Sequence, residues 1–216
     1  MIVGSRADAL QTAGSWTQRD TIWTDESRLD SGNVGAACVW KTTSGWTSRR
    51  FHLGGNKEVF DAEVYAILQA LSIIDQRQES SHRYTIFVDS TSAIDRIRSD
   101  SIGPGQRFAV AAIEACARVQ ARDNSVSIRW VAAHHEVTGT VKADEHAKAA
   151  AEGREPNSLR TTPDELRWET SLSHMTRVTT EARSRAAAQW ISSHLGDPRR
   201  KYRPPPGRGL RRKLLR

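Results

Sequence analysis

Two short stretches with the same pattern constrain the fold of this chain most strongly. Residues Thr21–Ser27 (TIWTDES) and Tyr84–Ser90 (YTIFVDS) are rich in apolar, β-branched and aromatic residues, as buried strands are. In each stretch the run turns polar at an aspartate, Asp25 in the first and Asp89 in the second. We therefore expect two strands that each carry one carboxylate at the carboxyl end.

The segment between these strands predicts a helix over Glu58–Ile74. Such a crossover lets the two strands lie parallel and adjacent, so that Asp25 and Asp89 meet at one edge of the sheet. Glu63 falls within the apolar face of this helix, where an unpaired carboxylate is costly and a compensating partner is expected. The apolar positions of that face are Phe60, Val64, Ile67, Leu68, Leu71 and Ile74.

The remaining elements complete an α/β fold. Turn residues around Gly32 and Gly45 join the first strand to strands over Asn33–Lys41 and Trp46–Leu53, which predicts an antiparallel meander. Later segments predict a short helix after Ser90–Ser92, a helix from about 107 to 119, and a fifth strand over 126–130. A further helix from about 140 carries Asp144. The expected sheet is thus mixed, with three antiparallel strands plus two parallel ones, flanked by helices.

Composition divides the chain into four parts, with residues 1–19 a flexible lead-in and 20–153 a single domain. A linker and an amphipathic helix from about Thr179 to Leu195 follow over 154–196, and residues 197–216 form a basic tail rich in proline and glycine. The net charge of +7 is concentrated in that tail, which holds nine basic residues and one acid. Neither a signal peptide nor a membrane span is visible, so we expect an intracellular protein, cytoplasmic or nuclear.

Four carboxylates therefore converge in the expected fold: Asp25, Glu63, Asp89 and Asp144. Hard oxygen ligands of this kind favour Mg²⁺ or Mn²⁺ over zinc, and two such ions promote phosphodiester hydrolysis. Each acid taken alone also has a structural interpretation: a strand-end turn, a pair with an arginine, or a favourable charge in the first turns of a helix. Cys38 and Cys116 are interpreted as reduced core residues.

The order of these elements and motifs resembles the type 1 ribonuclease H family. TDES resembles a TDGS-like segment, DAEVYAILQAL the helix that contains AE, and FVDSTSA the strand end that contains DS. WVAAHHEVTGTVKADEHAKAAA is similar to the segment of the form WVPGHxGxxGNExADxxAK. The resemblance implies a ribonuclease H-like fold, with the four acids as ligands of two Mg²⁺ ions, for which Mn²⁺ can substitute. It also implies that His134 assists proton transfer or product departure.

By this resemblance the chain is an enzyme that cleaves the RNA strand of RNA:DNA hybrids. The alternative is a catalytically degenerate, nucleic-acid-binding remnant of the same fold. Departures from the family pattern favour that alternative: Glu26 replaces a glycine, and several residues of the His134 loop differ. The four acids, all present in family order, favour the enzyme. A transposase or junction nuclease is the weaker third interpretation.

Contacts to nucleic acid are expected in two places. Backbone groups near Asn33 and Gly35 would meet 2′-hydroxyls of the RNA strand, and the basic tail would contact phosphates. The tail residues in question are Arg199, Arg200, Lys201, Arg211, Arg212 and Lys213. We expect a monomer. The C-terminal part of the chain resembles that of a non-LTR retrotransposon polyprotein, most like the fungal ones.

Overall fold

The computed structural model describes residues 20–132, 137–154 and 169–194. The chain divides into two compact units, residues 1–174 and 175–216, and each is treated by itself. The predicted lead-in, most of the linker and the basic tail lie outside the described residues. Among the described helices, none is long and apolar enough to cross a membrane.

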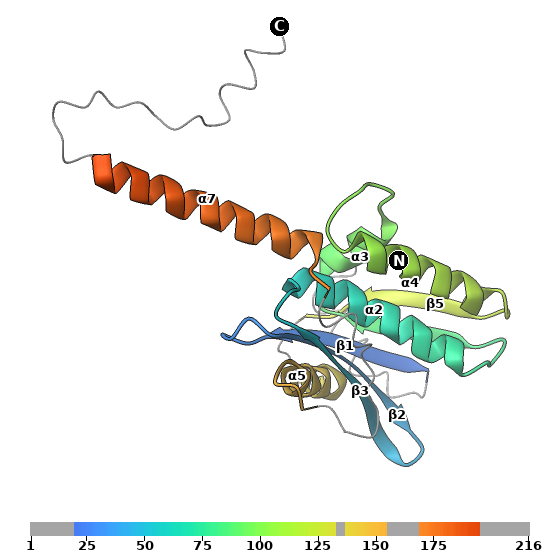
Figure 1. The fold of residues 1–216 in the computed structure, drawn as a ribbon. Helices are drawn as coiled ribbons and strands as arrows, with labels where there is room; N and C mark the ends of the chain where they lie inside the picture. The colour runs from blue at the N-terminus through green and yellow to red at the C-terminus, as the bar shows by residue number, and fades with distance from the viewer. Residues whose placement is uncertain (1–19, 133–136, 155–168, 195–216) are drawn as a thin grey trace, which may run out of the picture. The chain divides into compact units, whose positions relative to one another are not determined.

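A five-stranded mixed sheet forms the centre of the first unit (Figure 1). Its strands are β1 (Thr21–Arg28), β2 (Val34–Thr42), β3 (Gly45–Gly54), β4 (Arg83–Val88) and β5 (Ser125–Trp130), in the order β3-β2-β1-β4-β5. The first three strands are antiparallel, while β4 pairs in parallel with both β1 and β5. The predicted meander and the two added parallel strands are confirmed.

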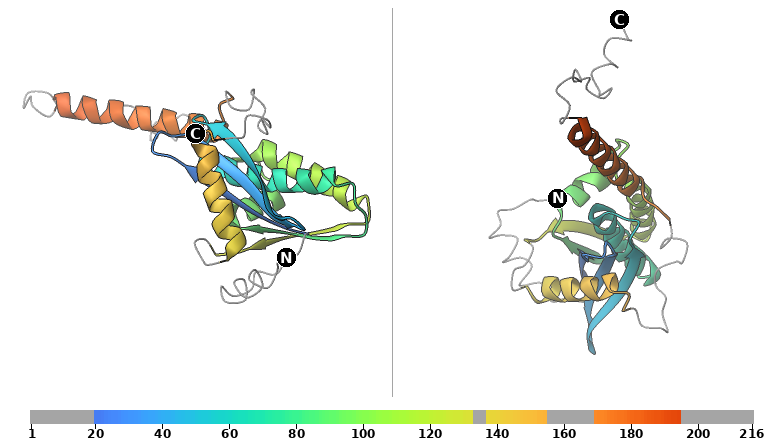
Figure 2. Two further views of the ribbon diagram at one scale, coloured as in Figure 1. Left: turned by 90° about the horizontal axis from the view of Figure 1, so that it is seen from below. Right: turned by 60° about the vertical axis from the view of Figure 1, so that its left-hand side comes forward.

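Helices cover both faces of this sheet (Figures 1 and 2). Helix α2 (Val59–Gln76) lies on one face beside α4 (Gln106–Gln120), and α3 (Thr91–Arg98) contacts both. Helix α5 (Thr138–Ala151) packs on the opposite face, against β1, β2 and β3. Strands β1 and β2 are buried on both faces over most of their length, whereas in β3 only Phe51 and Leu53 are buried.

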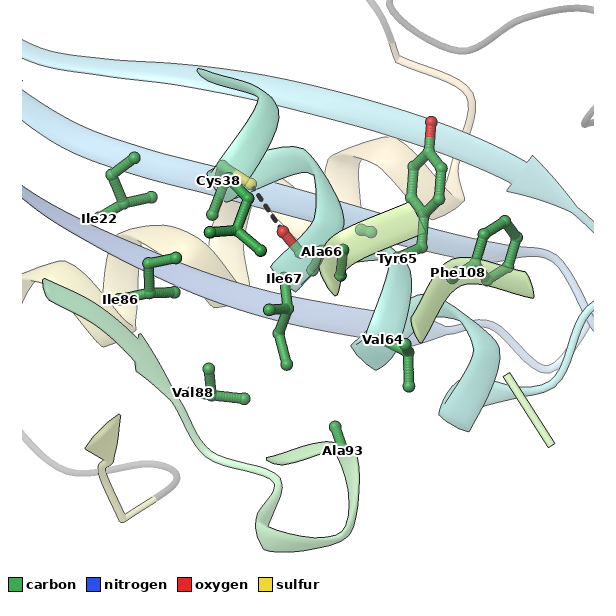
Figure 3. Packing of buried hydrophobic residues seen from close by; sticks show 14 of the residues in the cluster. Ile22, Cys38, Val64, Tyr65, Ala66, Ile67, Ile86, Val88, Ala93 and Phe108 are labelled. Atoms are coloured by element: carbon green, nitrogen blue, oxygen red, sulfur yellow. Dashed lines mark hydrogen bonds between the residues drawn. The ribbon is translucent and has the colours of Figure 1, made fainter. Parts of the chain in front are cut away.

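The larger core lies between the sheet and α2 (Figure 3). Ile22, Ile86 and Val88 reach from β1 and β4 toward Ile67 of α2. Cys38 lies in the same layer as a free thiol, and its Sγ donates to the carbonyl oxygen of Ala66 at 3.4 Å. This packing fixes the position of helix α2, which carries Glu63, on one face of the sheet.

The smaller core lies between the sheet and α5, and it depends on glycines. The rings of Trp23 and Phe87 stack with centroids 5.8 Å apart, beside Ala143 of α5. A Cβ on Gly139 would lie 2.3 Å from the Trp23 ring, and one on Gly35 would lie 2.2 Å from the backbone of α5. Only glycine permits these two close approaches, which set the depth at which α5 packs on the sheet.

Helix α7 (Leu172–His194) begins earlier than the sequence indicated, since the prediction placed the start near Thr179. The hydroxyl of Thr179 donates to the Met175 carbonyl oxygen at 2.7 Å, which satisfies this residue within a helix. At the start, the Ser171 hydroxyl accepts a hydrogen bond from the His174 amide at 3.1 Å. The helix therefore includes Leu172 to Val178, which the prediction left out.

Candidate functional site

The parallel pairing of β1 and β4 places Asp25 and Asp89 side by side. The paired register ends at Trp23 and Phe87, and each aspartate follows its partner of that pair by two residues. The hydroxyl of Thr24 donates to the Phe87 carbonyl oxygen at 3.1 Å and holds the two strand ends together. The predicted meeting of these two acids at one edge of the sheet is thus found in the structure.

The backbone of Asp89 is held in place from the neighbouring strand. The indole nitrogen of Trp130, the last residue of β5, donates to the Asp89 carbonyl oxygen at 2.9 Å. Because Asp89 lies just beyond β4, this contact replaces the strand pairing that the residue no longer has. It fixes the direction in which the Asp89 side chain leaves the sheet.

Glu26 joins the two aspartates in one cluster of carboxylates. Oxygen atoms of Asp25, Glu26 and Asp89 all lie within 4.8 Å of one another. Asp25 is only 8% exposed, and Glu26 is partly buried. The sequence singled out Glu26 as a departure from the family pattern, but it did not place this residue within the acid cluster.

The shared burial of these acids raises their pKa values. Burial raises the pKa of Asp25 to about 8, and the charge of Asp89 adds to the effect. The backbone amide of Glu26, which donates to Asp25 at 3.0 Å, opposes it. Burial likewise raises the pKa of Glu26 to about 9, with further contributions from Asp25, Asp89 and Glu63. Full ionisation of the cluster at neutral pH therefore needs added positive charge.

Glu63 reaches the site from helix α2. The hydroxyl of Ser90 donates to its Oε2 at 2.6 Å, which lowers the pKa of Glu63, but burial outweighs this contact and raises the pKa. The charge of Asp89 also raises it. The partner expected for this buried acid is therefore a hydroxyl at the start of α3, and the alternative pairing with an arginine is not found among the described residues.

Asp144 reaches the site from α5, on the other face of the sheet. Lys148, one helical turn further on, lies 2.7 Å from its Oδ2. This hydrogen bond raises the pKa of Lys148, and the charge of Asp25 contributes as well. Sequence reasoning missed Lys148, although its spacing of four residues from Asp144 on a helix could have indicated the pair.

The donor set fits a divalent cation. The acids come from four different elements, and they offer only oxygen, the donor that Mg²⁺ and Mn²⁺ prefer. Crowded carboxylates with raised pKa values are the arrangement that a bound cation stabilises, because it removes their mutual repulsion. Asp25, Glu26 and Asp89 are the described acids at this site whose oxygens lie close enough together to share one ion.

A second group with metal-binding residue types, Asp20, Glu79 and His82, has a structural explanation. His82 Nδ1 lies 3.2 Å from Asp20, and the Tyr84 hydroxyl donates to Glu79 at 2.7 Å. The first contact ties the residue before β4 to the residue before β1, and the second ties β4 to the loop that precedes it. We therefore interpret this group as structural.

The other predicted site residues either lie outside the described residues or make contacts within the fold. His134 and the tail residues Arg199, Arg200, Lys201, Arg211, Arg212 and Lys213 lie outside the described residues. The Asn33 carbonyl oxygen accepts from the Leu29 amide at 2.9 Å in the turn before β2. Gly35 is buried beneath α5, where packing alone requires a glycine. Binding of nucleic acid by Asn33 and Gly35 stays a prediction.

Comparisons with solved structures find RNase H domains. One is the N-terminal RNase H domain of a Mycobacterium tuberculosis protein, fused to maltose binding protein, with 16% identity and a TM-score of 0.49; the match covers 61% of this chain and 97% of that one. Another is RNase H1 from the halophilic archaeon Halobacterium salinarum, with 15% identity, a TM-score of 0.47, and coverage of 62% and 97%. No curated protein matches the chain.

The assignment rests on a family model. The model of the RNase H family matches residues 17–152, which is more than half of the 216 residues. The matched region contains all five strands of the sheet and includes Asp25, Glu63, Asp89 and Asp144. The chain therefore belongs to the RNase H family of hydrolases, the nucleases of RNA:DNA hybrids.

Proposed function

We propose that this chain is a catalytically competent ribonuclease H that cleaves the RNA strand of RNA:DNA hybrids endonucleolytically, by a two-metal mechanism. The observation that carries the proposal is the cluster at the carboxyl ends of β1 and β4. There Asp25 and Asp89 lie close together, and the charges of Glu63 and Asp144 act on the same cluster. Clustered, partly buried carboxylates destabilise a fold, so a chain without activity would have no need to keep them.

The proposed ligands of two Mg²⁺ ions are Asp25, Glu63, Asp89 and Asp144, and Mn²⁺ can substitute. When bound, the ions would activate a water and stabilise charge on the leaving oxygen. The chain's own residues provide the positions: Trp130 fixes the backbone of Asp89. Because the four acids come from separate elements, their positions depend on the packing of the whole domain.

His134 is the proposed residue for proton transfer or product departure. Its family counterpart lies in the loop between the fifth strand and the helix that carries the last acid, which is where His134 lies in this sequence. An imidazole can both accept and donate a proton, which suits either role.

We propose that the substrate is held by the domain and by the tail. Backbone groups near Asn33 and Gly35 would contact 2′-hydroxyls of the RNA strand, as selection for RNA requires. The arginines and lysines of residues 197–216 would add contacts to phosphates, which weaken as salt increases. The proposed acting form is a monomer.

We further propose an origin in a retroelement, most like the fungal non-LTR retrotransposons. The support is the order of segments, in which the RNase H region is followed by an amphipathic helix and a basic tail. An enzyme of this kind would act on hybrids inside the cell, in the cytoplasm or the nucleus.

One observation favours a second candidate function, that of a degenerate binding remnant. Glu26 adds a carboxylate to a site that in the resembled family has a glycine at this position. If this charge blocked the substrate, the chain would bind nucleic acid without cleaving it.

Cleavage of labelled substrates separates these candidates. An RNA:DNA hybrid, an RNA duplex, a DNA duplex and single-stranded RNA are each incubated with the chain, in Mg²⁺ or in EDTA. The proposal predicts internal cleavage of the RNA strand of the hybrid alone, and only in Mg²⁺. Binding of the hybrid without cleavage in either Mg²⁺ or Mn²⁺ would support the remnant instead.

A further inference from the structure

We propose that Glu58 is a positioning residue for cleavage, and that residues 169–174, here called the strap, hold it in place. The inference rests on the proposed function, and it extends the catalytic domain beyond residues 17–152, which the family model matches. Glu58 would act through Glu63, by fixing the start of α2 against the end of β1. The strap would thus be a working part of the enzyme.

Glu58 joins two elements that carry acids of the site. Its Oε2 accepts a hydrogen bond from Arg28 Nη1 at 3.0 Å. Arg28 is the last residue of β1, the strand that carries Asp25. Glu58 directly precedes α2, the helix that carries Glu63. The side chains of Arg28 and Glu58 are only 29% and 16% exposed, so solvent screens this ion pair less than it screens a surface pair.

The strap engages the other oxygen of Glu58. His174 Nδ1 donates to Glu58 Oε1 at 2.9 Å, and the His174 side chain is 16% exposed. Because an ionised carboxylate only accepts hydrogen bonds, the imidazole carries a proton on Nδ1. The Ser171 hydroxyl accepts from the His174 amide at 3.1 Å, which orients this histidine. Glu58 is therefore held between β1 and the strap.

Two further contacts tie the strap to the residues just before α2. The Ser171 amide donates to the Asn56 carbonyl oxygen at 2.9 Å. The ammonium of Lys57, a fully buried residue, donates to the Glu169 carbonyl oxygen. Burial of an ammonium is costly, so this carbonyl helps to compensate the burial of Lys57. The strap is thus bound to the domain by main-chain as well as side-chain groups.

The first turn of α2 belongs to the same network. The Glu58 amide donates to Asp61 Oδ2 at 2.9 Å, and the Ser173 hydroxyl donates to Asp61 Oδ1 at 3.4 Å. Apolar packing contributes less here, because Val59 and Phe60 are only partly buried, whereas the buried apolar residues of the helix all lie further along it. The position of this turn therefore depends on polar contacts.

This arrangement predicts that the strap controls rate more than stability. The carboxylate of Glu63 lies just beyond the first turn and accepts from the Ser90 hydroxyl at 2.6 Å. Release of the first turn would let this end of α2 shift, while the core packing of the later turns keeps the fold. Displacement of a reacting group by about 1 Å can cost about a hundredfold in rate.

Three variants of the full chain test the proposal. His174→Ala removes the contact of the strap to Glu58, and Glu58→Gln removes the charge that Arg28 and His174 contact. His174→Asn is the conservative variant, because its side-chain amide can donate in place of Nδ1. Glu181→Gln is the matched control, since it breaks an exposed ion pair with Arg177 on the same helix.

Cleavage of a labelled hybrid in Mg²⁺ is measured well below each unfolding midpoint. We expect kcat to fall about tenfold in His174→Ala and Glu58→Gln, with KM for the hybrid within about twofold of wild type. His174→Asn should retain most of the rate, and Glu181→Gln all of it. Wild-type kcat in a folded His174→Ala or Glu58→Gln would overturn the proposal, as would a His174→Asn rate as low as that of His174→Ala. If neither His174→Ala nor Glu58→Gln folds, the contacts serve the fold alone, and the proposal is overturned as well.

Hydrogen exchange gives a readout that does not depend on activity. The amides of Asp61 and Ala62 donate to the Glu58 carbonyl oxygen at 3.0 and 3.3 Å. They should exchange about tenfold faster in His174→Ala than in wild type or Glu181→Gln, while the amides of later turns of α2 stay unchanged. Equal exchange of these two amides in wild type and His174→Ala would contradict a strap that holds α2.

The wild type separates this inference from the proposed function. If the wild type does not cleave the hybrid in Mg²⁺ or Mn²⁺, the proposed function fails and the role of Glu58 in cleavage fails with it, whereas hydrogen exchange still reports whether the strap holds α2. If the wild type cleaves, but His174→Ala and Glu58→Gln match it in kcat and in exchange, this inference alone fails.

Discussion

The Ser90 hydroxyl donates a hydrogen bond to Glu63 Oε2 at 2.6 Å and thereby joins the acid of α2 to the start of α3. The same oxygen accepts from the amide of Ala93 at 3.2 Å, so Ser90 is also the N-cap of α3. Because Ser90 directly follows Asp89, one side chain orients an acid on a different element and fixes the chain beside another acid. The site and the fold are coupled at this residue.

Replacing Ser90 by alanine is therefore expected to reduce stability and activity together. Loss of the N-cap costs about 1 kcal/mol, and Glu63 loses its hydrogen-bond donor. Urea unfolding measures the first effect and hybrid cleavage the second. Ser90→Thr, which keeps the hydroxyl, is the control and should retain most of both. Equal stability of wild type and Ser90→Ala would contradict the dual role.

The raised pKa of Asp25 predicts a pH dependence for the metal-free protein. Its pKa is about 8 in the folded chain, whereas the unfolded chain has the ordinary, much lower value. Between about pH 4 and 8 the folded state thus binds more protons than the unfolded state, and the free energy of unfolding falls as pH rises. The contribution of Asp25 is fully present below this window and is lost across it.

Asp25→Asn should remove that loss, because the amide is neutral at every pH. In EDTA at about pH 8 we expect the variant to be more stable than wild type by on the order of 1–3 kcal/mol, with a smaller difference near pH 4. Urea unfolding at both pH values is the measurement. A wild type whose stability does not decline with pH relative to the variant would show that Asp25 is not held protonated.

Gly139 is expected to tolerate no side chain. A Cβ there would lie 2.3 Å from the Trp23 ring, so Gly139→Ala should destabilise by about 1–3 kcal/mol, although alanine is the better helix former. Gly55→Ala is the matched control, since its Cβ would meet Asn33 at an ordinary 3.5 Å. The measurement is thermal unfolding of both variants. Equal melting temperatures of Gly139→Ala and Gly55→Ala would contradict the close approach of α5 to Trp23.

Lys148 is expected to compete with the metal for Asp144. Its ammonium lies 2.7 Å from Asp144, and a cation there reduces the attraction of the site for a second cation. Lys148→Gln should therefore bind Mn²⁺ more tightly than wild type in a calorimetric titration. Lys142→Gln, on the same helix, serves as the control. Weaker binding by Lys148→Gln would mean instead that the lysine orients Asp144 for the metal.

The sequence predicted the framework of the site because β1 and β4 carry strong local signals. Asp25 and Asp89 each end an apolar, β-branched run. The helical crossover through α2 favours parallel pairing of the two strands, which the structure shows. Glu63 was found because a charge within an apolar helical face is conspicuous. These inferences need only the periodicity of single elements.

What the sequence did not predict depends on contacts between elements. The burial of Gly35 beneath α5 follows from how closely that helix packs on the sheet, and no local pattern encodes this depth. The proximity of Glu26 to Asp89 likewise depends on the register of two strands far apart in the sequence. Helix α7 was predicted too short because its first turns, LSHMTRV, mix three apolar residues with polar ones and lack a strong amphipathic pattern.

Loss of cleavage on neutralising Asp89 is the most direct test of the account. Wild type, Asp89→Asn and the control Asp95→Asn are compared on one labelled RNA:DNA hybrid in Mg²⁺ and in EDTA. Asp95 is a suitable control because its side chain is 75% exposed on α3. The account predicts Mg²⁺-dependent cleavage of the RNA strand by wild type and Asp95→Asn, and none by a folded Asp89→Asn. Cleavage that persists in Asp89→Asn would contradict the assignment of the acid cluster as the active site.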